Sequence, residues 1–207
     1  MKNRFINILI LFAAVTLCIS CDDDTDDVSF ITTYPDFEIQ GGTYLSIVSG
    51  NSYEDAGAIA TEGENQLEVT SSGSVDSDTP GLYTITYTAT NSDGYDGSAQ
   101  RVIAVTEEDV SSEDLSGPYL SGSRSVNYEQ RASGLYYGEN LWADSNGVSG
   151  YFLHTEGSTI LVPQQDSPFG AYTGSGTING DGTISLRFEI IEGGNAGAVL
   201  SRTLTKQ

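Results

Sequence analysis

Residues 74–105 read "SVDSDTPGLYTITYTATNSDGYDGSAQRVIAV" and carry the clearest strand pattern in the chain. Large side chains alternate with threonines in the first half, and a period of two is typical of a strand with one buried and one exposed face. The side chains expected to face a core are Tyr83, Ile85, Tyr87 and Ala89. The polar run at 91–97 predicts a turn into a second strand that ends at Val105.

A Pro-Gly turn, Pro80 and Gly81, stands just before the first of these strands. A tyrosine in this position can close the corner of a β-sandwich by donating its hydroxyl group to nearby backbone. We therefore expect the Tyr83 hydroxyl to bond close to its own turn.

The segment "SYEDAGAIA" at 52–60, followed by the stretch at 74–105, resembles the bacterial Ig-like domain found at the ends of pesticidal crystal proteins and in surface lipoproteins. The resemblance covers residues 30–106 and implies a β-sandwich that serves as a spacer or binding module, without catalytic residues. The positions that match the family are Tyr53, Asp55, Gly57, Pro80, Gly81 and Tyr83. We expect structural roles for them, with the glycines and proline in turns, a buried tyrosine and an aspartate that caps a turn.

The acidic, serine-rich residues 107–117 carry no strand pattern and predict a linker in which no side chain is expected to be buried. The remaining residues, 118–207, show short alternating runs bounded by turn residues, including "NGDG" at 179–182. The expected strands are 123–130, 135–143, 150–155, 158–165, 174–178, 184–191 and 199–205. The chain is therefore predicted to be all-β, an Ig-like sandwich followed by a small antiparallel barrel or sandwich.

Residues 1–20 predict a signal peptide, because Lys2 and Arg4 precede an apolar segment that is shorter than the roughly 20 residues of a membrane span. Ser20 and Cys21 then resemble the end of a bacterial lipobox, although Leu17 lies one position too early and Cys18 takes the usual place of leucine. The resemblance implies lipid on Cys21, which would anchor the protein to a membrane. The alternative is an ordinary signal peptide with a coincidental cysteine.

Residues 21–29 contain five aspartates and predict a solvated tether, because unpaired carboxylates resist burial. The run from Cys21 to Asp27 also resembles the acidic export tag of Bacteroidota surface lipoproteins. This resemblance implies an outer-membrane, lipid-anchored and surface-exposed protein, and the alternative is an acidic linker that faces the periplasm. After cleavage the single cysteine cannot form an internal disulfide.

The chain has 29 acidic and 8 basic residues, a net charge of −21, which becomes −23 once Lys2 and Arg4 are removed with the signal peptide. This charge excludes a nucleic-acid partner, because affinity for nucleic acid depends on Lys and Arg that meet phosphates. His154 is the sole histidine and we expect a structural role for it, because no catalytic partners accompany it, and the ligand count excludes a zinc site of the His/Cys type. Carboxylates are plentiful, so a small hydrolase with a carboxylate pair is the least favoured alternative. We therefore expect no enzyme activity, no catalytic residues, no metal and no cofactor.

Aromatic side chains surround an Asn/Asp/Gly loop in residues 134–152. The candidate ligand-binding residues there are Tyr136, Tyr137, Trp142 and Tyr151. They predict either a patch that stacks on sugars or contacts a protein, or an ordinary core, and only one of Tyr136 and Tyr137 can face a given side of a strand. The whole arrangement resembles Bacteroidota surface lipoproteins, some of them encoded beside glycan-import systems. We expect a non-catalytic spacer that presents a domain for a glycan or an outer-membrane uptake protein, and a purely structural or adhesive protein is the alternative.

Overall fold

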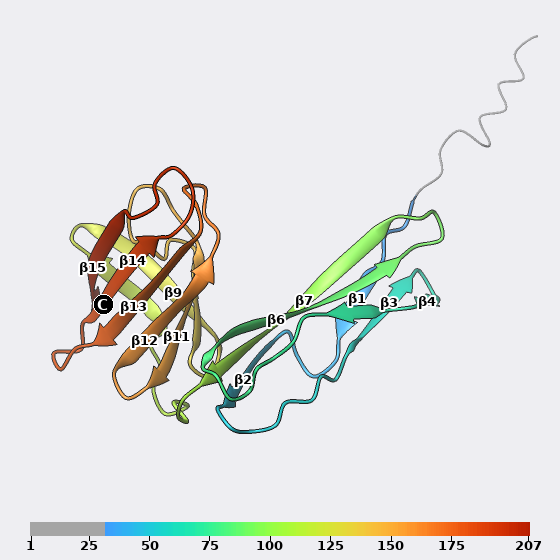
Figure 1. Ribbon diagram of the computed structural model, residues 1–207, viewed down its shortest axis with the longest axis horizontal. Helices are drawn as coiled ribbons and strands as arrows, with labels where there is room; N and C mark the ends of the chain where they lie inside the picture. The colour runs from blue at the N-terminus through green and yellow to red at the C-terminus, as the bar shows by residue number, and fades with distance from the viewer. Residues whose placement is uncertain (1–31) are drawn as a thin grey trace, which may run out of the picture. The chain divides into compact units, whose positions relative to one another are not determined.

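The computed structural model describes residues 32–207, which contain fifteen β-strands and no helix (Figure 1). Tyr34–Gln207 form one compact unit. Seven strands build an Ig-like sandwich and eight build a closed antiparallel barrel, so the predicted all-β class is confirmed. The predictions for residues 1–20 and 21–29, including lipid on Cys21, lie outside the described residues.

The sandwich has one sheet of order β1-β3-β4 and one of order β2-β7-β6-β5. The strands of the first sheet are β1 (Asp36–Ile39), β3 (Ala58–Glu62) and β4 (Asn65–Leu67). Those of the second are β2 (Tyr44–Val48), β5 (Thr70–Ser72), β6 (Gly81–Thr90) and β7 (Asp96–Thr106). β2 pairs with β7 in parallel, and the other pairs in both sheets are antiparallel.

The alternation in β6 places its side chains as the sequence predicts. Ile85, Tyr87 and Ala89 are buried, while the intervening threonines are half-buried or exposed. The Tyr83 hydroxyl donates to the Thr79 carbonyl at 2.8 Å, so the predicted tyrosine corner is confirmed. This bond joins the turn before β6 to the strand that forms half of the sandwich core.

An ion pair lies in the sandwich between the buried Arg101 of β7 and the half-buried Asp55 of the connection before β3. The Arg101 side chain is fully buried, and its guanidinium lies 5.6 Å from the centre of the Tyr87 ring. The guanidinium also donates to three backbone carbonyls, those of Gln40, Gly42 and Gly57. Tyr87 in turn donates to Asp55 at 2.6 Å, and the Gly57 backbone also bonds to this carboxylate, so Asp55 balances the buried charge in addition to its bond within the turn.

The pKa of Asp55 reflects two opposing effects, burial and the partners of its carboxylate. Burial alone would raise it, but hydrogen bonds from Tyr87 and Tyr53 and the charge of Arg101 together hold the pKa below its ordinary value. The charged form of Asp55 is therefore more stable in the folded protein than in the unfolded chain.

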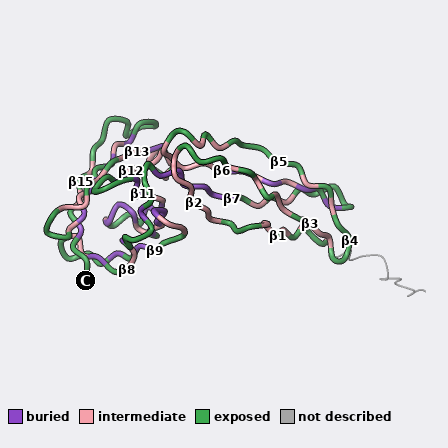
Figure 2. The backbone as a smooth tube through the Cα atoms, turned by 90° about the horizontal axis from the view of Figure 1, so that it is seen from below, coloured by how far each residue is buried: buried purple, intermediate pink, exposed green. Residues whose placement is uncertain are grey.

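The second half of β7 is buried on both faces (Figure 2). Ile103 faces the sandwich core, whereas Val102 and Ala104 belong to a second cluster with Leu135 and Leu153 of the barrel. A continuous apolar run, "VIAV" in this case, is the pattern of a strand that is covered on both sides. The sandwich and the barrel therefore share a small apolar core.

The segment 107–116 between the two parts carries no strand, but it is not free of packing as the sequence predicted. Val110 and Leu115 are buried. The amides of Glu107 and Glu108 both donate to the Thr155 carbonyl, at 2.9 and 3.0 Å. The apolar side chains and the backbone bonds hold this segment against the barrel.

The barrel is a meander in which each strand pairs with the next and β15 closes on β8. Its strands are β8 (Gly117–Ser121), β9 (Arg124–Ala132), β10 (Leu135–Gly138), β11 (Gly150–Glu156), β12 (Thr159–Gln165), β13 (Tyr172–Ile178), β14 (Ile184–Ile190) and β15 (Val199–Lys206). The "NGDG" turn joins β13 to β14 as predicted, with the Gly182 amide 2.9 Å from the Asn179 carbonyl. The sequence missed β8, whose short run "GPYLS" follows the polar segment without a clear alternation.

Aromatic side chains fill the barrel interior. Tyr128 and Phe152 meet edge to face with ring centres 5.1 Å apart. Gly138 makes room for them, because a Cβ there would lie 2.7 Å from the Tyr128 ring. An eight-stranded barrel is just wide enough for side chains to fill, and this one is filled.

The ion pair gives a first prediction. Asp55→Ala should lower the free energy of unfolding by about 3–5 kcal/mol, because it leaves the Arg101 charge buried without its counter-charge. Glu54→Ala removes the neighbouring exposed carboxylate and should change stability by less than about 0.5 kcal/mol. Urea unfolding of both variants is the measurement, and equal losses would contradict the role of the pair.

Because the Asp55 pKa is lowered in the folded state, the contribution of Asp55 to the free energy of unfolding should be present at neutral pH and be lost as the pH falls below about 4.

Candidate functional site

The four aromatic residues predicted from the sequence separate into two pairs. Tyr136 and Trp142 are buried in the barrel core, with exposed fractions of 0% and 2%. Tyr137 and Tyr151 are half-buried on the outer face of β10 and β11, where they lie directly opposite each other. The outer pair is the part of the cluster that a ligand can reach.

Tyr136 is a core residue, which corrects its assignment to a ligand site. Its ring stacks on Phe152 with centres 5.0 Å apart and planes inclined by 15°. Its hydroxyl accepts from the Leu115 amide at 3.1 Å and donates to the Glu113 carbonyl at 3.0 Å. The Tyr136 hydroxyl therefore holds the segment before β8 against the barrel. Its ring is buried against Phe152 and has no face that a sugar could reach.

Trp142 requires the same correction. The strand expected over 135–143 ends at Gly138, and the chain then turns over the end of the barrel. Ala143 takes a left-handed conformation in this connection, with φ of 49°. The Trp142 ring packs edge to face on Tyr172 at 5.1 Å, and its carbonyl accepts from Arg202 at 2.8 Å. Trp142 closes the barrel instead of presenting its ring to solvent.

Tyr137 borders a groove of about 230 Å³ on the outside of the barrel. The polar side chains that line the groove with it are Ser125, Asn127, Glu129, Glu139 and Asn140. Strand pairing explains the arrangement, because Tyr137 lies directly opposite Glu129 and Asn127 projects from the same face of β9. We call this set the Tyr137 groove.

Arg131 packs against the Tyr137 ring. Its guanidinium carbon lies 5.1 Å from the centre of that ring and 5.5 Å from the Tyr44 ring. It also pairs with Glu129 at 2.9 Å. A cation over an aromatic face is attractive, so Arg131 holds the ring in place and neutralises one carboxylate at the groove.

Tyr151 supports Tyr137 and does not line the groove. The two ring centres are 5.1 Å apart, and the Tyr151 hydroxyl lies 3.3 Å from that of Tyr44. Gln165 bonds both to the amide and to the carbonyl of Tyr151, at 2.6 and 2.8 Å. Burial raises the pKa of the Tyr151 phenol, and the hydrogen bond with Tyr44 raises it further, so the phenol is neutral at physiological pH.

The carboxylates and amides of the groove were not singled out from the sequence. Asn127 and Glu129 lie on the polar side of β9, and only the pairing of β9 with β10 brings them beside Tyr137. Glu139 and Asn140 follow directly after β10 and reach the groove because the strand ends at Gly138. A prediction of the register between β9 and β10 would have placed these residues beside Tyr137.

The other polar segments do not form a second centre of this kind. His154 is fully buried, and its Nε2 lies 2.7 Å from the Gly157 carbonyl. Asp144 and Asp181 accept from backbone amides two residues ahead, at 2.8 and 3.0 Å, as turn residues do. Within residues 32–207, no three His, Cys, Asp or Glu side chains gather in a metal-binding group. No helix in this part of the chain is long and apolar enough to cross a membrane.

Comparison with known proteins finds one family model that resembles the sandwich. Residues 37–105, about a third of the chain, match the model of the bacterial surface protein Ig-like domain. No curated protein matches the chain.

Solved structures with similar backbones include the lipoprotein BT2262 from Bacteroides thetaiotaomicron, with a TM-score of 0.42 and 17% identity over 84% of this chain and 100% of that chain. Another contains CBM51-2 in complex with GlcNAc and INT domains from Clostridium perfringens ZmpB, with a TM-score of 0.31 and 18% identity over 74% of this chain and 29% of that chain. A third contains the M60 catalytic domain of the same ZmpB with CBM51-1 and CBM51-2, with a TM-score of 0.32 and 18% identity over 80% of this chain and 15% of that chain.

The separation of the aromatic residues gives a second prediction. Tyr136→Ala and Trp142→Ala should each cost about 3–5 kcal/mol of unfolding free energy, because each opens a cavity in the barrel core. Tyr137→Ala should cost about 1 kcal/mol, since its side chain is half-buried and loses only its contacts with Tyr151 and Arg131. Thermal and urea unfolding would measure all three. A Tyr137→Ala loss as large as that of Trp142→Ala would contradict the assignment of Tyr137 to the surface.

Proposed function

We propose that this protein is a non-catalytic lipoprotein of the cell surface, in which the Ig-like domain is a spacer and the barrel binds a saccharide in the Tyr137 groove. The observation that carries the proposal is the lining of the groove, where a half-buried tyrosine side chain lies among two carboxylates and two amides. The bound glycan, or an outer-membrane uptake protein that delivers or receives it, is the partner we expect.

The chemistry of the groove suits a sugar ring. A pyranose has faces of C–H bonds that pack on an aromatic ring, and hydroxyl groups around its edge that need partners. The Glu129 and Glu139 carboxylates can accept from those hydroxyls, and the Asn127 and Asn140 amides can both donate and accept. Tyr137 is held by Arg131 and Tyr151, so its ring is positioned before a ligand arrives.

Charge narrows the class of saccharide. Two carboxylates line the groove, and Arg131 neutralises one of them. An added anion would meet the remaining negative charge, so the groove favours a neutral sugar over an acidic one. At about 230 Å³ the groove is smaller than the pockets that enclose drug-sized ligands, so it suits one or two sugar rings of a longer chain.

Surface location is supported by two features. The family matched by residues 37–105 is described as a domain of bacterial surface proteins. The sequence before the described residues has a signal peptide pattern, Cys21 and the aspartate run, which favour a lipid anchor in the outer membrane with the protein facing outward.

The non-catalytic assignment is supported by the surroundings of the histidine. His154 is fully buried with its Nε2 engaged by a backbone carbonyl, so it cannot serve as a base for a bound substrate. The alternative function, a purely structural or adhesive protein, is favoured by the filled barrel interior. The two functions differ in whether the Tyr137 groove has a ligand.

Tyr137→Ala tests the saccharide site. A panel of neutral oligosaccharides, including xylo-, manno- and malto-oligosaccharides, would be screened with residues 28–207, which contain the whole compact unit. We expect Kd values between about 10 μM and 1 mM for a shallow site, and no detectable binding by the variant. Tyr137→Phe keeps the ring and should retain most of the affinity, while Tyr95→Ala removes an exposed tyrosine of the Ig-like domain and should have no effect. Binding that survives Tyr137→Ala in a folded protein would refute the site.

Cys21→Ala tests the anchor. Without the thiol no lipid can be attached, so the protein should move from the membrane fraction into the soluble fraction. Cys18→Ala, which alters the other cysteine of the same segment, should leave the protein on the membrane. Retention of the Cys21→Ala protein in washed outer membranes would show that the attachment does not depend on lipidation.

A further inference from the structure

In residues 32–207, the exposed positive charge is confined to the barrel. Residues 32–207 contain 24 acidic and 6 basic side chains. The single basic residue of the sandwich, Arg101, is fully buried. The five others belong to the barrel and are Arg124, Arg131, Arg187, Arg202 and Lys206. An anion that approaches the described part of the protein therefore meets exposed cations on the barrel alone.

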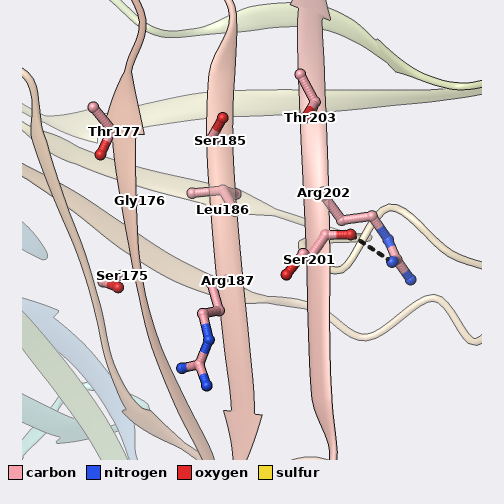
Figure 3. A pocket seen from close by; sticks show the side chains of 9 residues that line it. All are labelled: Ser175, Gly176, Thr177, Ser185, Leu186, Arg187, Ser201, Arg202 and Thr203. Atoms are coloured by element: carbon pink, nitrogen blue, oxygen red, sulfur yellow. Dashed lines mark hydrogen bonds between the residues drawn. The ribbon is translucent and has the colours of Figure 1, made fainter.

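Three of these five cations line two adjoining depressions on the barrel, which we call the arginine surface. The first depression, of about 350 Å³, lies across β13, β14 and β15 and includes Arg187 and Arg202. The Arg202 side chain projects from the same face of β15 as Leu204 and points away from Arg187 (Figure 3). The second, of about 560 Å³, includes Arg124 and Arg202. Ser201, Arg202 and Thr203 belong to both, so the two depressions adjoin along β15.

Hydroxyl groups form the floor between the arginines. The strand register places Arg187 between Ser175 and Ser201, and in the next row Ser185 between Thr177 and Thr203. These side chains project from the outer face of the barrel, because the alternate residues of β14 and β15 face its core. Small outward side chains on three adjacent strands leave a shallow trough that larger residues would have filled.

The arginines differ in how freely they can meet a ligand. The Arg124 side chain is exposed and makes no ion pair or hydrogen bond with any residue from 32 to 207. Arg187 lies 3.3 Å from Glu189, but both side chains are about half exposed, and such a pair is weak. Arg202 is committed to the Trp142 carbonyl and to Asp144, so it braces the loop over the barrel end.

The charge of the arginine surface is opposite to that of its surroundings. Its lining contains three arginines and one carboxylate, Asp144, for a net charge of +2, which falls to +1 when Glu189, the ion-pair partner of Arg187, is counted. Outside this lining, residues 32–207 carry −20. Since the surrounding charge repels anions, ligands with dense negative charge are disfavoured, and those with widely spaced anionic groups can bring one group to the arginines.

We propose that the arginine surface binds an acidic polysaccharide whose carboxylates are spaced along a polyhydroxylated chain. Guanidinium groups bind carboxylates through paired, charge-assisted hydrogen bonds, and Arg124 and Arg187 supply these groups. The serine and threonine hydroxyls between them can donate to and accept from sugar hydroxyls. The trough is open along the barrel wall, which suits a chain that lies across it. The site is separate from the Tyr137 groove, because the two share no lining residue.

The experiment uses residues 28–207 and four polymer probes. Hyaluronan and unsulfated chondroitin carry one carboxylate on every second sugar, dextran is a neutral polysaccharide, and polyphosphate is an anion without sugars. We expect the wild type to bind the two acidic polysaccharides at low salt, with an affinity that falls as salt rises, and to bind dextran and polyphosphate at least about tenfold more weakly. Equal binding of polyphosphate would show a general anion-binding surface and overturn the saccharide assignment, and the absence of hyaluronan and chondroitin binding would overturn the proposal.

The variants assign binding to the arginines. Arg124→Gln with Arg187→Gln should weaken hyaluronan binding by at least about tenfold, because charge-assisted contacts are lost, and Arg124→Lys should retain part of it. Lys206→Gln removes an exposed cation elsewhere on the barrel and should change affinity by less than about twofold. A folded double variant that binds as tightly as the wild type would refute the site. Tyr137→Ala should leave unchanged the binding of a hyaluronan fragment too short to reach both surfaces, so this proposal and the neutral-saccharide groove can fail independently.

Discussion

The guanidinium group of Arg101 is removed from water, and the fold of the sandwich is arranged to compensate for that. The free-energy cost of burying one charge exceeds the stability of a domain of this size, unless a counter-charge and hydrogen bonds replace the lost solvation. Asp55 supplies the charge, and carbonyls on the connections beside β2 and β3 supply the rest. Because a guanidinium has a fixed fork of donors, these segments must meet it at fixed positions, and the two sheets are thereby joined at one place.

The position of Arg101 extends this constraint to the barrel. It begins the run of six buried residues that ends at Thr106, so the strand that it holds in register also carries Val102 and Ala104. Those two side chains pack on Leu135 and Leu153, next to the strands that carry Tyr137 and Tyr151. Tyr44 of the sandwich then contacts both Arg131 and Tyr151. The residues that support the Tyr137 groove thus come from both parts of the molecule, although its lining comes from the barrel alone.

Local patterns in the sequence predicted the elements that depend on neighbouring residues. The alternation in β6, the corner at Tyr83 and the turn between β13 and β14 need only short-range information, and each was correct. The pairing of Arg101 with Asp55 joins positions 46 residues apart, and nothing in the local sequence of either distinguishes it. The prediction that Tyr136 and Trp142 could bind a ligand was wrong for a related reason. Composition marks aromatic residues without showing which face they take, and the early end of β10 at Gly138 decides that Trp142 enters the core.

Two surfaces of the barrel differ in their charge. The Tyr137 groove has carboxylates with one compensating arginine, whereas the arginine surface has an excess of cations on a floor of hydroxyls. At physiological ionic strength, exposed charges act over about 8 Å, so each surface is governed mainly by its own lining. The acidic sandwich contributes a weaker repulsion toward any polyanion and has no exposed cation of its own in residues 32–106. A mixed polysaccharide with neutral and acidic segments could therefore satisfy both surfaces at once, and binding at two weak sites on one rigid barrel would raise its affinity above that of either site.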